Sequence, residues 1–302
     1  MAQKEGYPEA DGYLFLPQYD KAKLESRATD SFNFRSDDVI VVGFLKSGNT
    51  WLLEVLKAMY NDWGLQKFGG AEAAMLLDER TVFNSHFCRK HEELVEAIKC
   101  EDLPSPRLMR SHLPATLFPC HVLKEKGVKV IYISRNPKDI VVSTYYFYKS
   151  FLHGACSTGD WEETVQSFLE DRQPLTPWVR HVGDWFQKGI EDNVLHVTYE
   201  EMKRDLPGTV RKIADFLQRP LTIEDIDRVV RTTTVDAMQS RLLKMLIVDE
   251  EMVPKAAKGE NPFVRKGVVG DWKNHFTVAQ SELFDSKIGS KVRSINPNIP
   301  YQ

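Results

Sequence analysis

The chain has 302 residues, of which 42% are hydrophobic and 11% aromatic, so it can bury a large core and is not disordered as a whole. Its 40 Lys and Arg residues are balanced by 43 Asp and Glu residues, giving a net charge of −3. Because these charges form no long block of one sign, we expect no general nucleic-acid binding through phosphate neutralisation, whereas a local basic pocket is compatible with the balance.

Three features of the sequence predict the cellular compartment. The first 19 residues carry charged side chains and lack the apolar run of a signal peptide. The longest apolar run, residues 242–248, is interrupted by Lys244 and is far shorter than the roughly 20 residues of a membrane span. The cysteines are scattered without a C-x-x-C pair, which favours reduced thiols over a zinc site. We therefore expect a cytoplasmic protein with no membrane association and no metal.

Alternating strand and helix patterns run along the chain. Short β-branched runs at residues 39–42, 128–134 and 194–199 predict buried parallel strands. Helical patterns follow them: an apolar stripe from Leu52 to Met59, a helix from Pro137 through Tyr148, and another that ends before Pro220. This order predicts a single α/β domain over residues 1–302, with a central parallel sheet flanked by helices. Residues 253–267, which contain Gly and Pro, are expected to form a long functional loop.

The segment between the first strand and its helix, residues 43–51, predicts a phosphate-binding loop. Backbone N–H groups and the helix dipole can hold an anion at such a turn. A nucleotide-hydrolysing P-loop would read G-x-x-x-x-G-K-[ST]. Gly48 and Thr50 fit that spacing, but Asn49 stands at the lysine position and Lys46 supplies a cation ahead of Gly48. The pattern therefore indicates a P-loop-like nucleotide site that differs from a hydrolysing one.

Two further basic turns accompany this loop. Residues 135–139 (RNPKD) follow the second predicted strand, and residues 265–272 (RKGVVGDW) lie near the C-terminus. Two of the three turns stand at the carboxyl ends of strands, where open α/β sheets bind ligands. Such a set suits a ligand with two separate phosphate groups.

These motifs resemble those of the cytosolic sulfotransferases, which move a sulfonate from 3′-phosphoadenosine 5′-phosphosulfate (PAPS) to a hydroxyl or amine. The matching segments stand in the family's order at residues 46–51, 111–114, 135–139 and 265–272, with smaller matches at 177–178, 199–202 and 276–278. The likeness spans residues 37–285. It implies PAPS as co-substrate, no metal, and an acceptor that is a small, mostly apolar molecule.

The resemblance also implies which residues bind the donor. Those matching the family's contacts to the 5′-phosphosulfate, the adenine and the 3′-phosphate are Lys46, Ser47, Gly48, Asn49, Thr50, Trp51, Tyr199, Thr233, Thr234, Arg135, Ser143, Arg265, Lys266 and Gly267. The family usually has an aromatic residue where this chain has Val235, so we expect one weaker adenine contact.

Catalysis of sulfonate transfer needs positioned cations and a base, because charge spreads over oxygens during an in-line displacement. The resemblance implies His112 as the base that activates the acceptor, and Lys46 as the cation at the leaving phosphate. It also implies that Ser143 interacts with Lys46 and restrains donor hydrolysis before the acceptor binds. Arg110 replaces the family's second catalytic lysine; it keeps the positive charge but is larger and cannot lose a proton. Leu45 replaces a proline, which is expected to loosen the turn.

The sequence also gives candidates for the acceptor pocket and for a dimer interface. Phe147 matches a pocket residue of the family, and Phe83, Phe87, Phe151 and Met245 are further candidates. An apolar pocket that ends in one histidine favours small phenols, alcohols or amines, and a steroid-like alcohol is compatible with it. The segment from Lys273 to Glu282 resembles the family's dimer motif and predicts a homodimer.

Two other functions are compatible with the sequence. Arg110 and Val235 are compatible with a catalytically degenerate protein that holds a nucleotide or a hydrophobic ligand without turnover. A P-loop kinase-like enzyme is the second alternative, and Asn49 argues against it.

Overall fold

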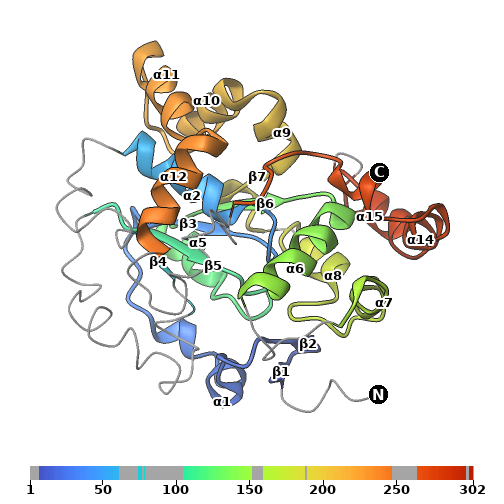
Figure 1. The fold of residues 1–302 in the computed structure, drawn as a ribbon. Coiled ribbons are helices and arrows are strands. Elements are labelled where there is room, and N and C mark those ends of the chain that lie inside the picture. The colour runs from blue at the N-terminus through green and yellow to red at the C-terminus, as the bar shows by residue number, and fades with distance from the viewer. Residues whose placement is uncertain are drawn as a thin grey trace.

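A five-stranded parallel sheet lies at the centre of the computed structural model, which describes residues 7–60, 74–76, 78, 105–151, 159–187, 189–246, 264–296 and 299–301. The strand order is β4-β5-β3-β6-β7 (Figure 1). The strands are β4 (Ala74–Leu76), β5 (Leu108–Ser111), β3 (Val39–Val42), β6 (Lys129–Ser134) and β7 (Val194–Thr198). Val41 is in register with Arg110 of β5 on one side and with Ile131 of β6 on the other.

The three predicted strands are confirmed as β3, β6 and β7. Every residue of β3 is buried, with Val41 facing one core and Ile40 and Val42 facing the other. This alternation explains why the strand has no polar face: helices cover the sheet on both sides. The short strand-like run before His112 is β5, which continues through Ser111 and therefore includes Arg110.

Helices pack on both faces of the sheet. One core joins α2 (Asn49–Met59), α9 (Tyr199–Arg204), α10 (Leu206–Phe216) and α11 (Ile223–Thr232) to the sheet. The other joins α6 (Pro137–Phe151), α7 (Trp161–Leu169) and α8 (Trp178–Asp184). The predicted helices are present, and α6 runs on past Tyr148 to Phe151. Alternation of strands and helices thus produces the predicted α/β fold with a parallel sheet.

The remaining strands and α-helices are short or peripheral. They are β1 (Glu9–Ala10), β2 (Tyr13–Leu14), α1 (Lys21–Glu25), α5 (His121–Lys126), α12 (Val235–Leu246), α14 (Val278–Phe284) and α15 (Ser290–Ile295). Of the predicted loop at residues 253–267, only residues 264–267 lie within the described part of the chain. Among the helices described, none combines the length and the apolar character needed to cross a bilayer.

The buried ammonium group of Lys138 attaches the C-terminal segment to helix α6. Lys138 stands in the first turn of α6, and its Nζ lies 2.8 Å from the Asp285 carboxylate and 2.8 Å from Ser281 Oγ. The same ammonium lies 4.3 Å from the ring centre of Trp272. A buried lysine requires such partners, because a charge taken out of water unpaired is costly. The contacts place the C-terminal loop beside the turn that carries Arg135.

Candidate functional site

The phosphate loop between β3 and α2 is held by a side chain at the position where a hydrolysing P-loop has lysine. The Asn49 side chain is buried and donates hydrogen bonds to the carbonyl oxygens of Phe44 (2.9 Å) and Gly43 (3.4 Å). Gly48 has a φ of 107°, and a Cβ there would lie 2.8 Å from the Tyr199 ring, so glycine is required. Asn49 therefore fixes the shape of the loop from inside, and the amide that donates these bonds faces the loop backbone.

The cation of this loop lies beside an aromatic ring. The Nζ of Lys46 is 4.1 Å from the ring centre of Phe147 on α6. Burial, together with the charges of Arg135 and Arg265, lowers the pKa of Lys46 to about 7. The next residue, Ser47, has a buried Oγ that forms no hydrogen bond with the described residues. A lysine with a reduced pKa and an unsatisfied buried hydroxyl both favour an anionic ligand at this loop.

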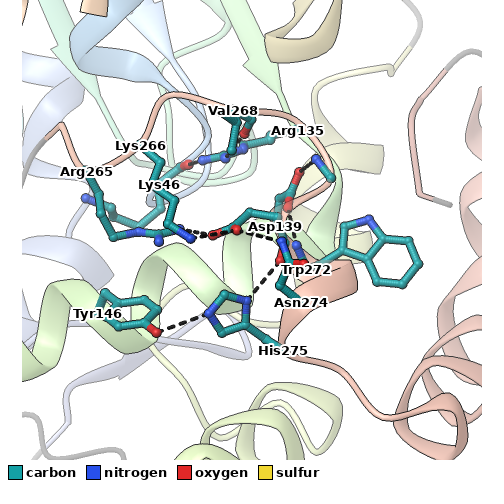
Figure 2. Close-up of polar contacts among 12 residues, drawn as sticks. Lys46, Arg135, Asp139, Tyr146, Arg265, Lys266, Val268, Trp272, Asn274 and His275 are labelled. Atoms are coloured by element: carbon teal, nitrogen blue, oxygen red, sulfur yellow. Dashed lines mark hydrogen bonds and ion pairs between the residues drawn. The ribbon is translucent and has the colours of Figure 1, made fainter. Parts of the chain in front are cut away.

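Arg135 connects the phosphate loop to the C-terminal loop. It follows β6, and its guanidinium donates hydrogen bonds to the carbonyl oxygens of Lys46 (3.2 Å) and Val268 (3.4 Å), as Figure 2 shows. The same guanidinium lies 4.2 Å from the ring centre of Tyr199. The three basic turns predicted from the sequence thus meet in one place (Figure 2).

The other two cations of the cluster, Arg265 and Lys266, share one carboxylate. Asp271 accepts hydrogen bonds from Arg265 Nη2 (2.6 Å) and Lys266 Nζ (2.9 Å), and also from Asn274. Burial alone would raise the pKa of Asp271, but the hydrogen bonds from Arg265 and Lys266 outweigh it and hold the pKa well below its usual range. Asp271 is therefore charged at neutral pH.

His112 lies at the end of β5, beside the phosphate loop. Its Nδ1 is 2.8 Å from the carbonyl oxygen of Gly43, a contact in which only a protonated Nδ1 can donate. Burial lowers the pKa of His112 to about 4; the hydrogen bond to Gly43 opposes this shift, and the charges of Arg110 and Lys46 add to it. At neutral pH the imidazole is neutral, with its proton on Nδ1 and a lone pair on Nε2.

Asp78 supports this segment and was not singled out from the sequence. The buried carboxylate accepts hydrogen bonds from Ser111 Oγ (2.5 Å), Tyr19 Oη (2.7 Å) and the backbone N–H of His112 (2.9 Å). Burial raises the pKa of Asp78 in spite of these bonds. No local pattern predicts the role, because the partners lie 33 residues later and 59 residues earlier in the chain.

Glu200 is a second acidic residue that the motifs did not mark as functional. Its Oε1 accepts the backbone N–H of Asn136 (2.9 Å), which joins the start of α9 to the turn that carries Arg135. Its Oε2 is buried without a hydrogen-bond partner among the described residues. Burial raises the pKa of Glu200 to about 7, although the Asn136 bond opposes the shift.

The residues expected around adenine gather at the end of α11. Trp51 Nε1 donates to the carbonyl oxygen of Thr233 (2.9 Å), and the Trp51 and Tyr199 rings meet edge to face with their centres 5.3 Å apart. Thr234 Oγ1 accepts the N–H of Ala237 and so caps α12. A cavity of about 310 Å³ is lined by Trp51, Met202, Lys203, Leu206, Val230, Thr233, Thr234, Val235 and Asp236.

Val235 also shapes the C-terminal loop. A Cβ on Gly267, which has a φ of +65°, would lie 2.4 Å from Val235 Cγ2. Gly267 is therefore required at this position both by its backbone conformation and by the packing of Val235.

The remaining expected site residues have fewer described contacts. Thr50 and Ser143 are half-buried, in α2 and α6 respectively. Arg110 lies on β5, and its Nε is buried without a hydrogen-bond partner among the described residues. Phe83 and Phe87 lie outside the described residues, as do the side chains of Phe151 and Met245. Phe147 is thus the one expected pocket residue whose side chain the structure describes.

Comparison with known proteins identifies the family. The profile of the sulfotransferase domain matches residues 36–296. The chain belongs to the sulfotransferase family. It is 36% identical to mouse Sulfotransferase 2B1 over 261 residues, covering 86% of this chain and 73% of that protein. It is also 36% identical to human Sulfotransferase 1E1 over 262 residues, covering 85% and 84% of the two chains.

Solved structures agree with this assignment. Mouse sulfotransferase SULT7A1, complexed with PAP, is 28% identical and superposes with a TM-score of 0.69, covering 94% of each chain. Retinol dehydratase, in complex with androsterone and PAP, shares the fold with a TM-score of 0.75 at 21% identity, covering 95% of this chain and 89% of that one. The predicted P-loop-like α/β fold of this sulfotransferase is therefore confirmed.

Proposed function

We propose that this sulfotransferase transfers a sulfonate from PAPS to a hydroxyl or amine of a small, mostly apolar acceptor. The observation that carries the proposal is the meeting of Lys46, Arg135 and the Arg265–Lys266 pair beside His112. Two groups of cations suit a ligand with two separate phosphates. Mouse SULT7A1, which shares the fold, is complexed with PAP.

Donor binding is assigned to the three basic turns. The loop from Lys46 to Thr50 would hold the 5′-phosphosulfate, with the unsatisfied Ser47 hydroxyl as one donor. Arg135 with Arg265 and Lys266 would hold the 3′-phosphate, while Trp51 and Thr233 would lie against adenine. Ser143, half-buried on α6, would interact with Lys46 and restrain hydrolysis of the donor until the acceptor binds.

The chemical step would use His112 and Lys46. The Nε2 lone pair of His112 takes the proton of the acceptor hydroxyl as its oxygen attacks sulfur. The bond between sulfur and the bridging oxygen breaks, and its electron pair remains on the 5′-phosphate. Lys46 stabilises that charge, because an anion beside its ammonium group raises the pKa from about 7 and keeps the group protonated. The products are the sulfonated acceptor and adenosine 3′,5′-bisphosphate (PAP).

The acceptor is proposed to be a phenol, alcohol, amine or steroid-like alcohol. Support comes from Phe147, whose ring lies against Lys46 and would therefore line the space next to the reacting atoms. An aromatic wall beside one base suits an apolar body that carries a single nucleophile.

We also propose a cytoplasmic homodimer. Lys273, Val278 and Glu282 of the expected dimer motif are all exposed, and Val278 is 76% exposed. An apolar residue so exposed between two opposite charges suits a self-complementary contact across a two-fold axis.

Turnover with labelled PAPS across phenols, steroids and amines tests the function, with ATP turnover measured in parallel. Sulfonated product with at least one acceptor is expected. Binding of PAP without any turnover would instead support the degenerate binder, and ATP hydrolysis would support a kinase-like enzyme. A larger increase in melting temperature with PAP than with AMP is expected, because AMP lacks the 3′-phosphate.

A further inference from the structure

Two buried carboxylates, Asp139 and Asp271, join the separate parts of the basic cluster. Asp139 stands in the first turn of α6, is 1% exposed, and follows Arg135 by four residues. Its Oδ2 accepts the N–H of Gly270 (2.7 Å) and its Oδ1 accepts the N–H of Trp272 (2.9 Å). These are the N–H groups of the two residues on either side of Asp271, so Asp139 clamps the backbone at that residue (Figure 2).

Asp271 in turn fixes two cations that would otherwise be mobile. The side chains of Arg265 and Lys266 are 28% and 50% exposed, whereas that of Asp271 is 4% exposed. Long basic side chains at such exposures lose considerable rotamer entropy when a ligand orders them. Because both bond to one buried carboxylate, their charged ends are ordered before a ligand arrives.

We infer that Asp139 and Asp271 are positioning residues that set the preference of this enzyme for a 3′-phosphorylated nucleotide. Neither carboxylate is expected to touch the phosphate, since like charges repel. Asp139 places the C-terminal loop relative to Arg135, and Asp271 places Arg265 and Lys266 on that loop. The inference rests on the proposed function, because it assigns these cations to the 3′-phosphate.

Asp271 could instead compete with the 3′-phosphate for the two cations. The direction in which PAP affinity changes when the carboxylate is removed distinguishes this role from the ordering role. If the carboxylate competed with the 3′-phosphate for Arg265 and Lys266, its removal would strengthen binding of PAP. If it orders the two cations, its removal weakens binding of PAP and leaves AMP nearly unaffected. Because its pKa is held below the usual range, Asp271 stays charged from pH 6 to 8, and the effect should not vary over that interval.

The experiment measures the affinities for PAP and AMP by calorimetry in Asp271→Asn, Asp139→Asn and the double variant. We expect each single variant to lose about tenfold or more in PAP affinity, the loss typical of a charge-assisted contact, and less than twofold in AMP affinity. The double variant should lose no more than the worse single variant, because both residues act through one loop. Asp225→Asn is the control: it removes one carboxylate from the capping box of α11 and should leave both affinities unchanged.

Two further variants distinguish positioning from general loss of structure. Asp271→Glu keeps the charge and should recover part of the PAP affinity. In an Arg265→Met, Lys266→Met background, Asp271→Asn should change PAP affinity less than twofold, because the side chains it acts through are gone. If Asp271→Asn or Asp139→Asn does not fold, as judged by melting temperature without nucleotide, the Arg265→Met, Lys266→Met variant and Asp271→Glu decide the matter: both should lose PAP affinity while AMP affinity changes less than twofold, and equal losses for the two nucleotides would overturn the positioning role.

The outcomes keep this inference apart from the proposed function. A wild-type enzyme that binds PAP no better than AMP would overturn the assignment of the 3′-phosphate site, and with it the proposed function. A wild type that prefers PAP, with Asp271→Asn showing an equal or stronger preference, would overturn the positioning role alone. Equal losses in PAP and AMP affinity would assign Asp271 to the general stability of the loop, and would also overturn it.

Discussion

The Nδ1 atom of His112 lies 2.8 Å from the carbonyl oxygen of Gly43, the residue that opens the phosphate loop. The contact fixes the tautomer of the imidazole, because a carbonyl oxygen can only accept. It leaves Nε2 as the basic nitrogen, and it attaches the proposed base to the loop proposed to hold the donor.

His112→Ala should therefore abolish acceptor activation while leaving donor binding intact. We expect kcat to fall by roughly a hundredfold or more, the range typical of a lost general base, with PAP affinity changed less than about threefold. Steady-state kinetics and calorimetry measure the two quantities. His181→Ala would be a poor control, because His181 Nε2 lies 3.1 Å from the His112 carbonyl oxygen. His121→Ala, in the first turn of α5 and exposed, is the matched control. Near-normal turnover of His112→Ala would exclude the histidine as the base.

Proton uptake on nucleotide binding should report on Lys46. With a pKa of about 7, the Lys46 amine is mostly neutral at pH 8 in the free enzyme, and an anionic ligand should restore its charge. Binding of PAP at pH 8 should thus take up a proton, and PAP affinity should fall as the pH rises from 7 to 9. At pH 6 Lys46 is already charged and contributes no uptake.

Calorimetry in buffers of different ionisation enthalpy measures this proton. Glu200, whose pKa is raised to about 7, also binds protons more readily near an anion. The Glu200→Gln variant is therefore needed to subtract the contribution of Glu200 to the proton uptake. Lys46→Met in that background should show no remaining uptake at pH 8. Uptake that persists in the double variant would place the titrating group elsewhere.

The local parts of this site could be predicted from the sequence, and the contacts between them could not. The β-branched run before Gly43 and the apolar stripe from Leu52 define a strand, a turn and a helix, which place Lys46 at a strand end. By contrast, Gly270 is 131 residues from Asp139 in the chain, and no spacing rule indicates that bond. The acceptor pocket was equally unreadable, because an aromatic residue such as Phe147 fits a core as well as a pocket.

Asn49 shows how the structure refines a motif assignment. The resemblance groups it with donor-binding residues, and the P-loop pattern predicts that Lys46, ahead of Gly48, supplies the cation that is missing at residue 49. The structure shows its side-chain amide donating to the carbonyl oxygens of Phe44 and Gly43. The side chain of Asn49 thus shapes the turn.

Self-association is predicted to depend on the exposed side chain of Val278. Val278→Glu places a charge in the proposed two-fold contact and should give a monomer that still binds PAP, as measured by light scattering at micromolar concentration. Ile223→Glu is the matched control, because Ile223 is 69% exposed on α11, outside the motif. A wild-type protein that is monomeric at this concentration, or equal dissociation by both variants, would contradict the proposal.

Arg110 is expected, from the resemblance, at the position of the family's second catalytic lysine, and two features support a role in the chemistry. Arg110 lies on β5 two residues before His112, and its charge contributes to the lowered pKa of that histidine. Its Nε is buried without a hydrogen-bond partner among the described residues, so the guanidinium retains unused donors close to the proposed base. We therefore expect it to face the sulfonate oxygens.

Arg110→Ala should lower kcat by roughly a hundredfold, because a cation at the oxygens of the transition state commonly stabilises it by about 2–4 kcal/mol. PAP carries no sulfonate, so its affinity should change much less. Arg110→Lys restores the family's residue and should retain much of the wild-type rate or exceed it, whereas Arg110→Gln, which keeps donors but loses the charge, should resemble Arg110→Ala. If the wild type has no turnover and Arg110→Lys acquires it, the arginine is what makes this chain degenerate. An active wild type whose rate is unchanged in Arg110→Ala would mean that the guanidinium points away from the sulfonate.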